Sequence, residues 1–268
     1  MDNQSPISTE EPASSQGVRN WVELPLDVLS KIFLKFGAVD ILCRAQSVCS
    51  TWRKVSKDPM LFRSIDMRWN LYEFDIYDME TMAGEAVDRS CGQLVESSSL
   101  RHLRLVSCQE VSFDALIKIA KKAVLLEELE ICYCSFSGNK LDMLKTVGKA
   151  CRQLKSFRLN CRGYRWRRVE CDDEALAIAE NMPQLRRLHL FRSKLTNVGL
   201  GAILNGCLHL EYLDLRQCFN VNLEGDVLMS CRDRLIELRL PNDSTADYEF
   251  DAAMVQWFEG HLPWLPAP

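Results

Sequence analysis

The stretch LRHLRLVSC, residues 100–108, sets leucines in the spacing L-x-x-L-x-L and places a cysteine three residues later. The same spacing, with Phe or Ile at some positions, begins again at five later leucines: Leu126, Leu154, Leu185, Leu210 and Leu235. Successive starts lie 26, 28, 31, 25 and 25 residues apart. Six units in one register, over more than half of the 268 residues, indicate an array of repeats rather than a chance motif.

Each unit combines two local signals. The apolar residues of the L-x-L core alternate, which predicts a short strand whose leucines face inward. A helix should follow, with Ser112 as a candidate N-cap and Leu116, Ile119 and Ala120 in its apolar stripe. Further helices are expected at residues 172–179 and 196–204. The period is that of leucine-rich repeats, so we expect an α/β solenoid with parallel strands inside and helices outside.

The repeats also explain five of the twelve cysteines. These five lie at the ninth position of a unit or three residues before its first leucine: Cys108, Cys134, Cys151, Cys207 and Cys218. We expect buried, reduced packing residues, because the chain shows no export signal. The alternatives are a metal site or a nucleophile, but Cys132-x-Cys134 lacks the spacing of a zinc site. We therefore expect no metal, no cofactor and no catalytic residue.

Residues 1–20 are rich in Ser, Glu, Pro and Gln and contain no apolar run. We expect a disordered leader here, neither a signal peptide nor a transit peptide. No apolar stretch approaches the ~18–20 residues of a membrane span. The net charge of −4 and the pI near 5.7 argue against nucleic acid as a partner. The expected setting is intracellular, in cytoplasm or nucleus, without membrane attachment.

Residues 21–67 lack the repeat and are typical of a small helical module. Pro25 suits the first turn of one helix. Asp40 is expected to cap a second helix over residues 41–48, and residues 49–55 should form a third. A module of this size buries only a small core, so its remaining apolar residues are expected to form a partner surface.

Three segments of this module resemble the F-box motif: LPLDVLSKIF at residues 24–33, VCSTWR at residues 48–53, and Leu61-Phe62. With the repeats that follow, the chain resembles the plant family of F-box/leucine-rich-repeat proteins over about residues 21–251. The resemblance implies a three-helix F-box at residues 21–67 and a solenoid at residues 68–243. A C-terminal cap or tail would occupy residues 244–268.

The resemblance also implies a function, that of the substrate receptor of an SCF-type ubiquitin ligase. In that family the F-box binds a Skp-type adaptor and, through it, a cullin. The implied adaptor-binding residues are Leu24, Pro25, Val28, Leu29, Ile32, Phe33, Val48, Cys49 and Trp52. Of these, Ile32, Val48 and Trp52 are expected to belong at least half to the core of the module, whereas Leu24 and Pro25 are favoured as contacts. The alternative is a repeat scaffold that binds a protein without any ligase, and no sequence feature supports an enzyme.

Between the inward leucines, side chains should point to the concave face, where solenoids bind extended partners. The candidate substrate-binding residues are His102, Arg104, Glu128, Glu130, Arg158, Arg187, His189, Phe191, Tyr212, Asp214, Arg216 and Arg239. Charges of both signs with two aromatic residues suit a protein substrate. The alternative is a solvated surface without a special role.

Two places depart from the period. Cys91-Gly-Gln-Leu94 begins a unit only six residues before Leu100, and we expect a repeat cut short near residues 91–99. The basic insertion RGYRWRR, residues 162–168, is expected to be a loop on the rim of the solenoid rather than a nucleic-acid contact.

Overall fold

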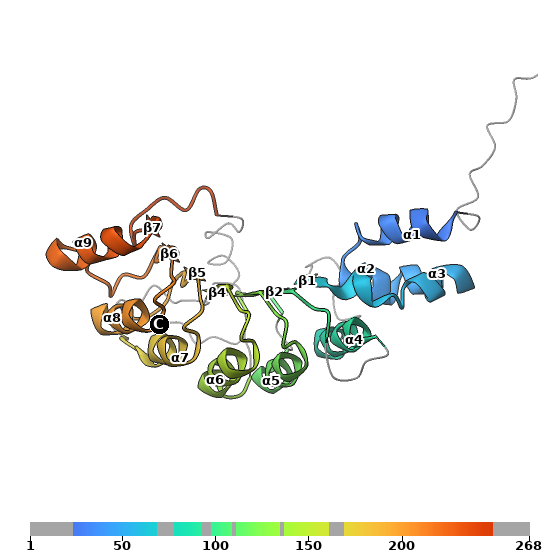
Figure 1. Cartoon of the computed structure of the whole chain (residues 1–268), viewed down its shortest axis with the longest axis horizontal. Helices are drawn as coiled ribbons and strands as arrows, with labels where there is room; N and C mark the ends of the chain where they lie inside the picture. Colours follow the sequence, from blue (N-terminus) through green and yellow to red (C-terminus); the bar gives the residue numbers. More distant parts are fainter. Residues whose placement is uncertain are drawn as a thin grey trace, which may run out of the picture.

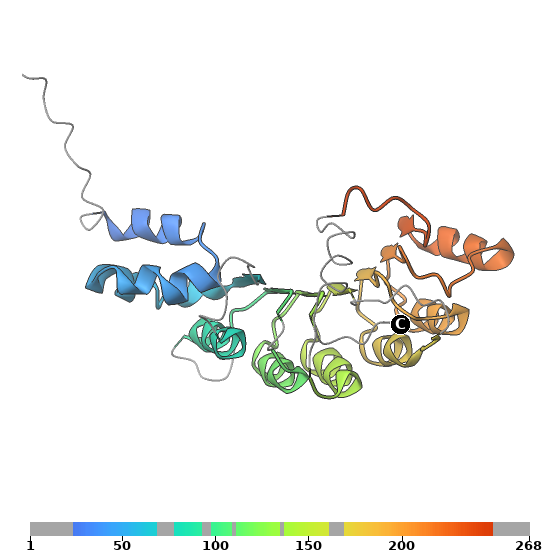
Figure 2. The ribbon, with the colours of Figure 1, turned by 180° about the vertical axis from the view of Figure 1, so that it is seen from behind.

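The computed structural model describes residues 24–68, 78–92, 98–108, 111–134, 137–160 and 169–248. In this part of the chain a helical N-terminal module leads into a solenoid (Figure 1). The strands form one parallel sheet in sequence order, and the helices of the repeats lie along one side of it (Figure 2). This arrangement confirms the expected α/β class, with parallel strands inside and helices outside.

The sheet has seven strands within the described residues: β1 Ser64–Arg68, β2 His102–Val106, β3 Glu128–Cys132, β4 Ser156–Asn160, β5 Arg187–His189, β6 Tyr212–Asp214 and β7 Glu237–Arg239. Parallel pairing in register aligns one apolar residue from each repeat: Leu103, Leu129, Phe157, Leu188, Leu213 and Leu238. All except Leu238 are buried. Burial of this row against the helices holds neighbouring repeats together.

Strand β1 was not expected from the sequence. It lies inside the segment assigned above to the helical module, yet Ile65 and Met67 pair in register with Leu103 and Leu105. The spacing Phe62-x-x-Ile65-x-Met67 repeats the apolar pattern without a leucine, which is why it escaped the repeat alignment. The sheet therefore begins within the expected F-box segment.

Helix α4 (Met79–Cys91) connects β1 to β2, at the place where the sequence predicted a shortened repeat. Residues 93–97, on which that prediction depends, lie outside the described residues, as does the basic insertion at 162–168. After this gap Ser98 is buried, and its hydroxyl accepts a hydrogen bond from the N–H of Leu100 (3.0 Å). A second hydrogen bond joins Ser98 to Ser90, so the chain is anchored to α4 just before β2.

The remaining helices of the solenoid are α5 Phe113–Lys122, α6 Lys140–Ala150, α7 Asp173–Asn181, α8 Asn197–Gly206 and α9 Gly225–Arg234. The hydroxyl of Ser112 accepts a hydrogen bond from the N–H of Ala115 (3.1 Å), which confirms the predicted N-cap. Asn139 and Thr196 cap α6 and α8 in the same way. The helices expected at residues 172–179 and 196–204 are present, with ends shifted by one or two residues.

The repeat cysteines are packing residues, as expected: Cys108, Cys151, Cys207 and Cys218 are buried, and Cys134 is half-buried. The Sγ of Cys151 donates to the carbonyl of Ala123 (3.5 Å), and that of Cys207 to the carbonyl of Met182 (3.4 Å). Each acceptor ends the helix of the preceding repeat, where carbonyls lack a partner within the helix. A thiol at this position therefore caps a neighbouring helix while it fills apolar space.

In the N-terminal module, α1 (Leu26–Phe33) and α3 (Ser50–Val55) match the expected first and third helices. The prediction that Asp40 caps a helix over residues 41–48 was wrong. Helix α2 runs over Ala38–Cys43, and the 3-10 turns η2 (Ala45–Ser47) and η3 (Pro59–Phe62) complete the module. Asp40 lies in the first turn of α2, where its carboxylate pairs with Arg44 one turn later (2.8 Å).

Two glycines of α8 provide a test of helix packing. At Gly206 an added Cβ would lie 2.3 Å from the carbonyl oxygen of Ala179 in α7, whereas at Gly201 it would meet no atom within 4 Å. We expect Gly206→Ala to lower the free energy of unfolding by about 1–3 kcal/mol through overpacking. Gly201→Ala should raise it by up to about 1 kcal/mol through helix propensity. Urea unfolding measures both effects, and equal effects of the two variants would contradict this packing.

Candidate partner-binding surfaces

The nine residues expected to bind the adaptor fall into two groups. Leu29 and Phe33 belong to the core of the module, being 1% and 0% exposed, and Phe33 packs edge-on against Trp52 with ring centroids 5.2 Å apart. These two residues hold α1 in place and offer no surface. The expectation that Val48 belongs to the core was wrong, because its side chain is 55% exposed. The others lie at or near the surface: Pro25, Val28 and Val48 are exposed, while Leu24, Ile32, Cys49 and Trp52 are half-buried.

Four further exposed apolar side chains lie in the same module, and the motif did not single them out as contacts: Leu26, Leu34, Phe36 and Met60. With Val28 and Val48 they make six of the fifteen large apolar side chains that are exposed in the described residues. Such a concentration on a few short helices is typical of a surface that another protein covers.

The module is tied to the solenoid by Arg89 of α4. Its guanidinium donates to the carbonyl of Ser56 (3.1 Å) and to the side-chain oxygen of Gln46 (2.8 Å), and it lies over the ring of Phe62. One apolar core also runs from Leu29 in α1 into the solenoid without interruption. Packed contacts therefore set the orientation of the module relative to the sheet.

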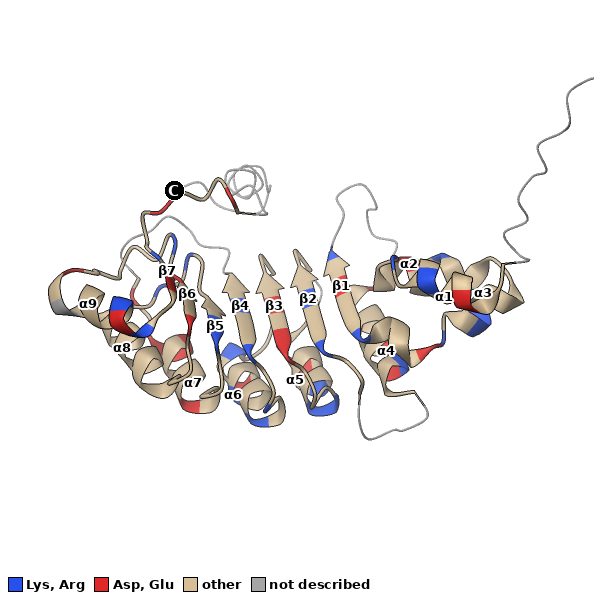
Figure 3. Ribbon diagram, turned by 45° about the horizontal axis from the view of Figure 1, so that its top comes forward, with Lys and Arg blue, Asp and Glu red and all other residues tan. Residues whose placement is uncertain are grey.

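The side chains between the apolar positions form rows across the concave face of the sheet. Successive strands contribute to the middle row Asp66, Arg104, Glu130, Arg158, His189, Asp214 and Arg239. A neighbouring row holds His102, Glu128, Ser156, Arg187, Tyr212 and Glu237. Ser64, which pairs with His102, and Asp66 were not expected in these rows, because both lie on the unexpected strand β1. Ser156 and Glu237 also lie in these rows, although they were not among the candidate substrate-binding residues. Figure 3 shows charged residues of both signs on the strands.

Charges of opposite sign pair across neighbouring strands in the middle row. Arg104 lies 3.5 Å from Asp66 and 3.1 Å from Glu130, and Arg158 lies 3.3 Å from the same Glu130 carboxylate. Each charge on β1 to β4 in this row thus meets its opposite on the next strand. This part of the concave face is a neutral ladder rather than a charged groove, and partners must recognise its shape and hydrogen-bonding groups.

Near β6 the same row is more deeply buried. Arg216 donates from Nε and Nη2 to the two carboxylate oxygens of Asp214 (3.1 and 2.8 Å), and Nδ1 of His189 lies 3.6 Å from this carboxylate. Burial alone would raise the pKa of Asp214, but the nearby His189 ring and the hydrogen bonds from Arg216 hold it below its ordinary value. Burial lowers the pKa of His189, and the Asp214 carboxylate opposes this only in part.

The third row, at the ends of the strands, begins with the exposed Arg68 on β1 and continues with apolar or uncharged residues. Val106, Cys132, Asn160 and Phe191 are all buried there. The ring of Tyr248, from the segment after β7, stacks on Phe191 with centroids 4.4 Å apart. Phe191 was expected to be an aromatic contact for a substrate; it lies on the predicted face, but Tyr248 conceals it. Two other candidate substrate-binding residues on this face, Asp214 and Arg216, are buried as well.

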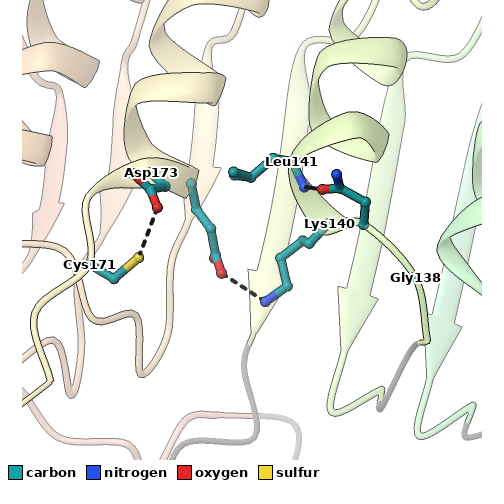
Figure 4. A pocket seen from close by; sticks show the side chains of 7 residues that line it. Gly138, Lys140, Leu141, Cys171 and Asp173 are labelled. Carbon is teal, nitrogen blue, oxygen red and sulfur yellow. Dashed lines mark hydrogen bonds and ion pairs between the residues drawn. The ribbon is translucent and has the colours of Figure 1, made fainter.

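A shallow pocket lies between the starts of α6 and α7 (Figure 4), lined by Gly138, Asn139, Lys140, Leu141, Cys171, Asp173 and Glu174. Its Lys140 and Glu174 neutralise each other (2.8 Å). Nowhere in the described ranges do three His, Cys, Asp or Glu side chains gather in a way that could hold a metal ion. Burial raises the pKa of Cys207 to about 11 and that of Cys151 to about 12, so both thiols stay protonated and unreactive near neutral pH.

None of the helices that the structure describes is both long and apolar enough to cross a bilayer.

These features define a class of protein: a small helical docking module fused to a leucine-rich-repeat solenoid. A model of the F-box-like family matches residues 21–68. F-box protein SKIP19 of Arabidopsis thaliana is 43% identical over 254 residues, which cover 87% of this chain and 81% of the relative. Putative F-box/LRR-repeat protein 22 of the same plant is 42% identical over 271 residues, which cover 91% and 85%.

A third relative, Putative F-box/LRR-repeat protein 23 of Arabidopsis thaliana, is 45% identical over 248 residues, which cover 85% of this chain but 54% of the relative. This chain therefore spans about half the length of that protein. The chain covers most of the length of the other two relatives at more than 40% identity. It therefore belongs to the family of plant F-box/leucine-rich-repeat proteins.

The buried His189 predicts a pH dependence of stability. Because burial lowers its pKa, the folded chain keeps this ring neutral at pH values where the unfolded chain already takes up a proton, with an ordinary pKa of about 6.5. The free energy of unfolding should therefore fall as the pH drops below about 6.5. We expect urea unfolding at pH 7.5 and pH 5.5 to show this loss, and His189→Asn to reduce it.

His102→Asn is the matched control, because the side chain of His102 is 45% exposed on the same face. This variant should keep the pH dependence of the wild-type chain. An undiminished loss of stability in His189→Asn would contradict the assignment to His189.

Proposed function

We propose that this chain is the substrate-recognition subunit of an SCF-type ubiquitin ligase. The F-box binds a Skp-type adaptor, which joins the chain to a cullin, and the concave face of the solenoid binds a protein substrate for ubiquitination. The observation that carries the proposal is the exposure of large apolar side chains at F-box positions, Val28 and Val48 among them. A scaffold that bound its partner without a ligase would have no use for this surface.

The exposure of each side chain supports a division of the motif residues into direct and indirect contributors to adaptor binding. Pro25, Val28 and Val48 are exposed and Leu24 is half-buried, so all four can touch a partner directly. Leu29 and Phe33 act indirectly, because their burial fixes the helix that carries the contact residues. The proposed contact surface therefore combines the exposed motif positions with additional exposed side chains such as Leu26 and Met60.

In this function the chain itself is not catalytic. It holds a substrate at a fixed orientation to the adaptor, and other subunits supply the ubiquitin transfer. Neither contact requires a cofactor. Raised thiol pKa values at Cys151 and Cys207 support a packing role for the repeat cysteines rather than a nucleophilic one. We infer that the chain acts in the cytoplasm or nucleus.

Two exposed valines allow a controlled test of the adaptor contact. Val48 lies in the F-box and is 55% exposed, and Val198 lies on α8 and is 70% exposed. Val48→Asp should reduce capture of a Skp-type adaptor at least tenfold, because a carboxylate would be buried without a partner in the complex. Val198→Asp, with the same chemical change far from the F-box, should capture the adaptor as the wild-type chain does.

The double change Leu24→Ala and Pro25→Ala is the second variant, and it should also abolish capture. Circular dichroism of all variants establishes that the fold is retained. If both F-box variants captured the adaptor normally, the proposed adaptor contact would be wrong. The alternative, a scaffold that binds a protein without a ligase, would then be favoured.

A further inference from the structure

The segment after β7 returns across the concave side of the sheet toward β4 (Figure 1). Its residues Asp247 and Tyr248 contact Asn160 in β4, Phe191 after β5 and Arg216 after β6, and Tyr248 packs against a cluster of Val106, Cys132 and Tyr133. Asn160, which donates a hydrogen bond to the hydroxyl of Tyr248, lies 88 residues earlier in the chain. A short, irregular segment therefore joins parts of this face that lie far apart in the sequence.

Tyr248 occupies a socket with distinct walls. Phe191 stacks on its ring at an interplanar angle of 13°, and the guanidinium of Arg216 lies 5.2 Å from the ring centroid. Asn160 reaches its hydroxyl, and an apolar cluster of Val106, Cys132 and Tyr133 packs against it. An apolar floor, a cation and a polar group at the far end suit a tyrosine side chain.

Asp247 occupies an adjacent cationic site. Its carboxylate lies 2.5 Å from Nη1 of Arg216 and 3.1 Å from Nη2 of Arg239. Arg216 also donates to the carbonyl of Ser244 (3.0 Å). The socket thus recognises an acidic side chain and the aromatic side chain directly after it, and Arg216 contacts both.

The walls of the socket are held by contacts that do not involve its occupant. Asp214 fixes the guanidinium of Arg216 through three side-chain hydrogen bonds and accepts a fourth from the backbone N–H of Arg216 (3.0 Å). The amide of Asn160 donates to Sγ of Cys132 (2.9 Å), while its Oδ1 is buried without a hydrogen-bond partner among the described residues. Buried acceptors without a partner are rare, and this one is open to a donor on a bound ligand.

We propose that this socket binds an acidic residue followed directly by an aromatic residue in a protein partner, and that Asp247 and Tyr248 occupy it from the same chain. Rigid aromatic anchors beside a desolvated arginine are the usual centres of binding energy in protein interfaces. Within the function proposed above, on which this inference rests, the partner is the substrate. Because the resident pair is tethered close to the socket, its effective concentration is of the order of millimolar, and a partner must compete with it.

The test uses a fluorescent peptide with the sequence Ser-Thr-Ala-Asp-Tyr, that of residues 244–248, blocked at both ends. The control peptide, Ser-Thr-Ala-Tyr-Asp, has the same composition and charge. Fluorescence polarisation compares the full wild-type chain with its double variant Asp247→Ser and Tyr248→Ser. The double variant should bind the first peptide at least tenfold more tightly than the wild-type chain does, and at least tenfold more tightly than it binds the control.

Adding Arg239→Gln to the double variant should weaken binding of the first peptide about two- to fivefold, because one exposed ion pair is lost. Equal binding of the two peptides, or no saturable binding to the double variant, would overturn the proposal. Loss of a cooperative unfolding transition in the double variant would also overturn the proposal. Asp247 and Tyr248 would then be needed for folding rather than occupying a binding site. Adaptor capture is measured separately with the same proteins. Failure of adaptor capture would contradict the ligase function but would not affect the conclusion from peptide binding.

Discussion

Lateral pairing of incomplete units is the interaction on which the whole molecule depends. Each unit offers one helix and a strand of three to five residues, which cannot enclose a core alone. Parallel register brings the apolar rows together. The thiols of Cys151 and Cys207, at the ends of α6 and α8, donate hydrogen bonds to the unit before each of them. The F-box takes part in the same stack, because β1 follows directly from η3.

Leucine periodicity predicted the strands of units that keep at least one leucine, and it failed at β1, whose apolar positions Phe62, Ile65 and Met67 include none. Strand alternation also predicted that Arg104 and Glu130 share the concave face. It could not predict their ion pair, since pairing depends on the register between units about 26 residues apart. The covering of Phe191 by Tyr248 was equally out of reach, because that contact joins segments without any shared pattern.

The F-box motif shows the same division between pattern and packing. It presents Leu29, Phe33 and Val48 as equivalent members of one motif, yet the first two are core residues and the third is exposed. The difference arises from how α1 and α3 pack against each other, which a local pattern does not contain. Arg89 lies outside the motif, yet its two hydrogen bonds to Ser56 and Gln46 connect the module to the solenoid.

The neutral ladder on the concave face has a consequence for the speed of recognition. Charges that cancel between adjacent strands produce little field beyond a Debye length of about 8 Å at physiological salt, so an approaching protein is not steered toward the sheet. Unsteered association proceeds at about 10⁵–10⁶ M⁻¹s⁻¹, well below the rate of charge-assisted encounters. Selectivity on such a surface is then expressed in the dissociation rate, that is, in how long a bound partner stays.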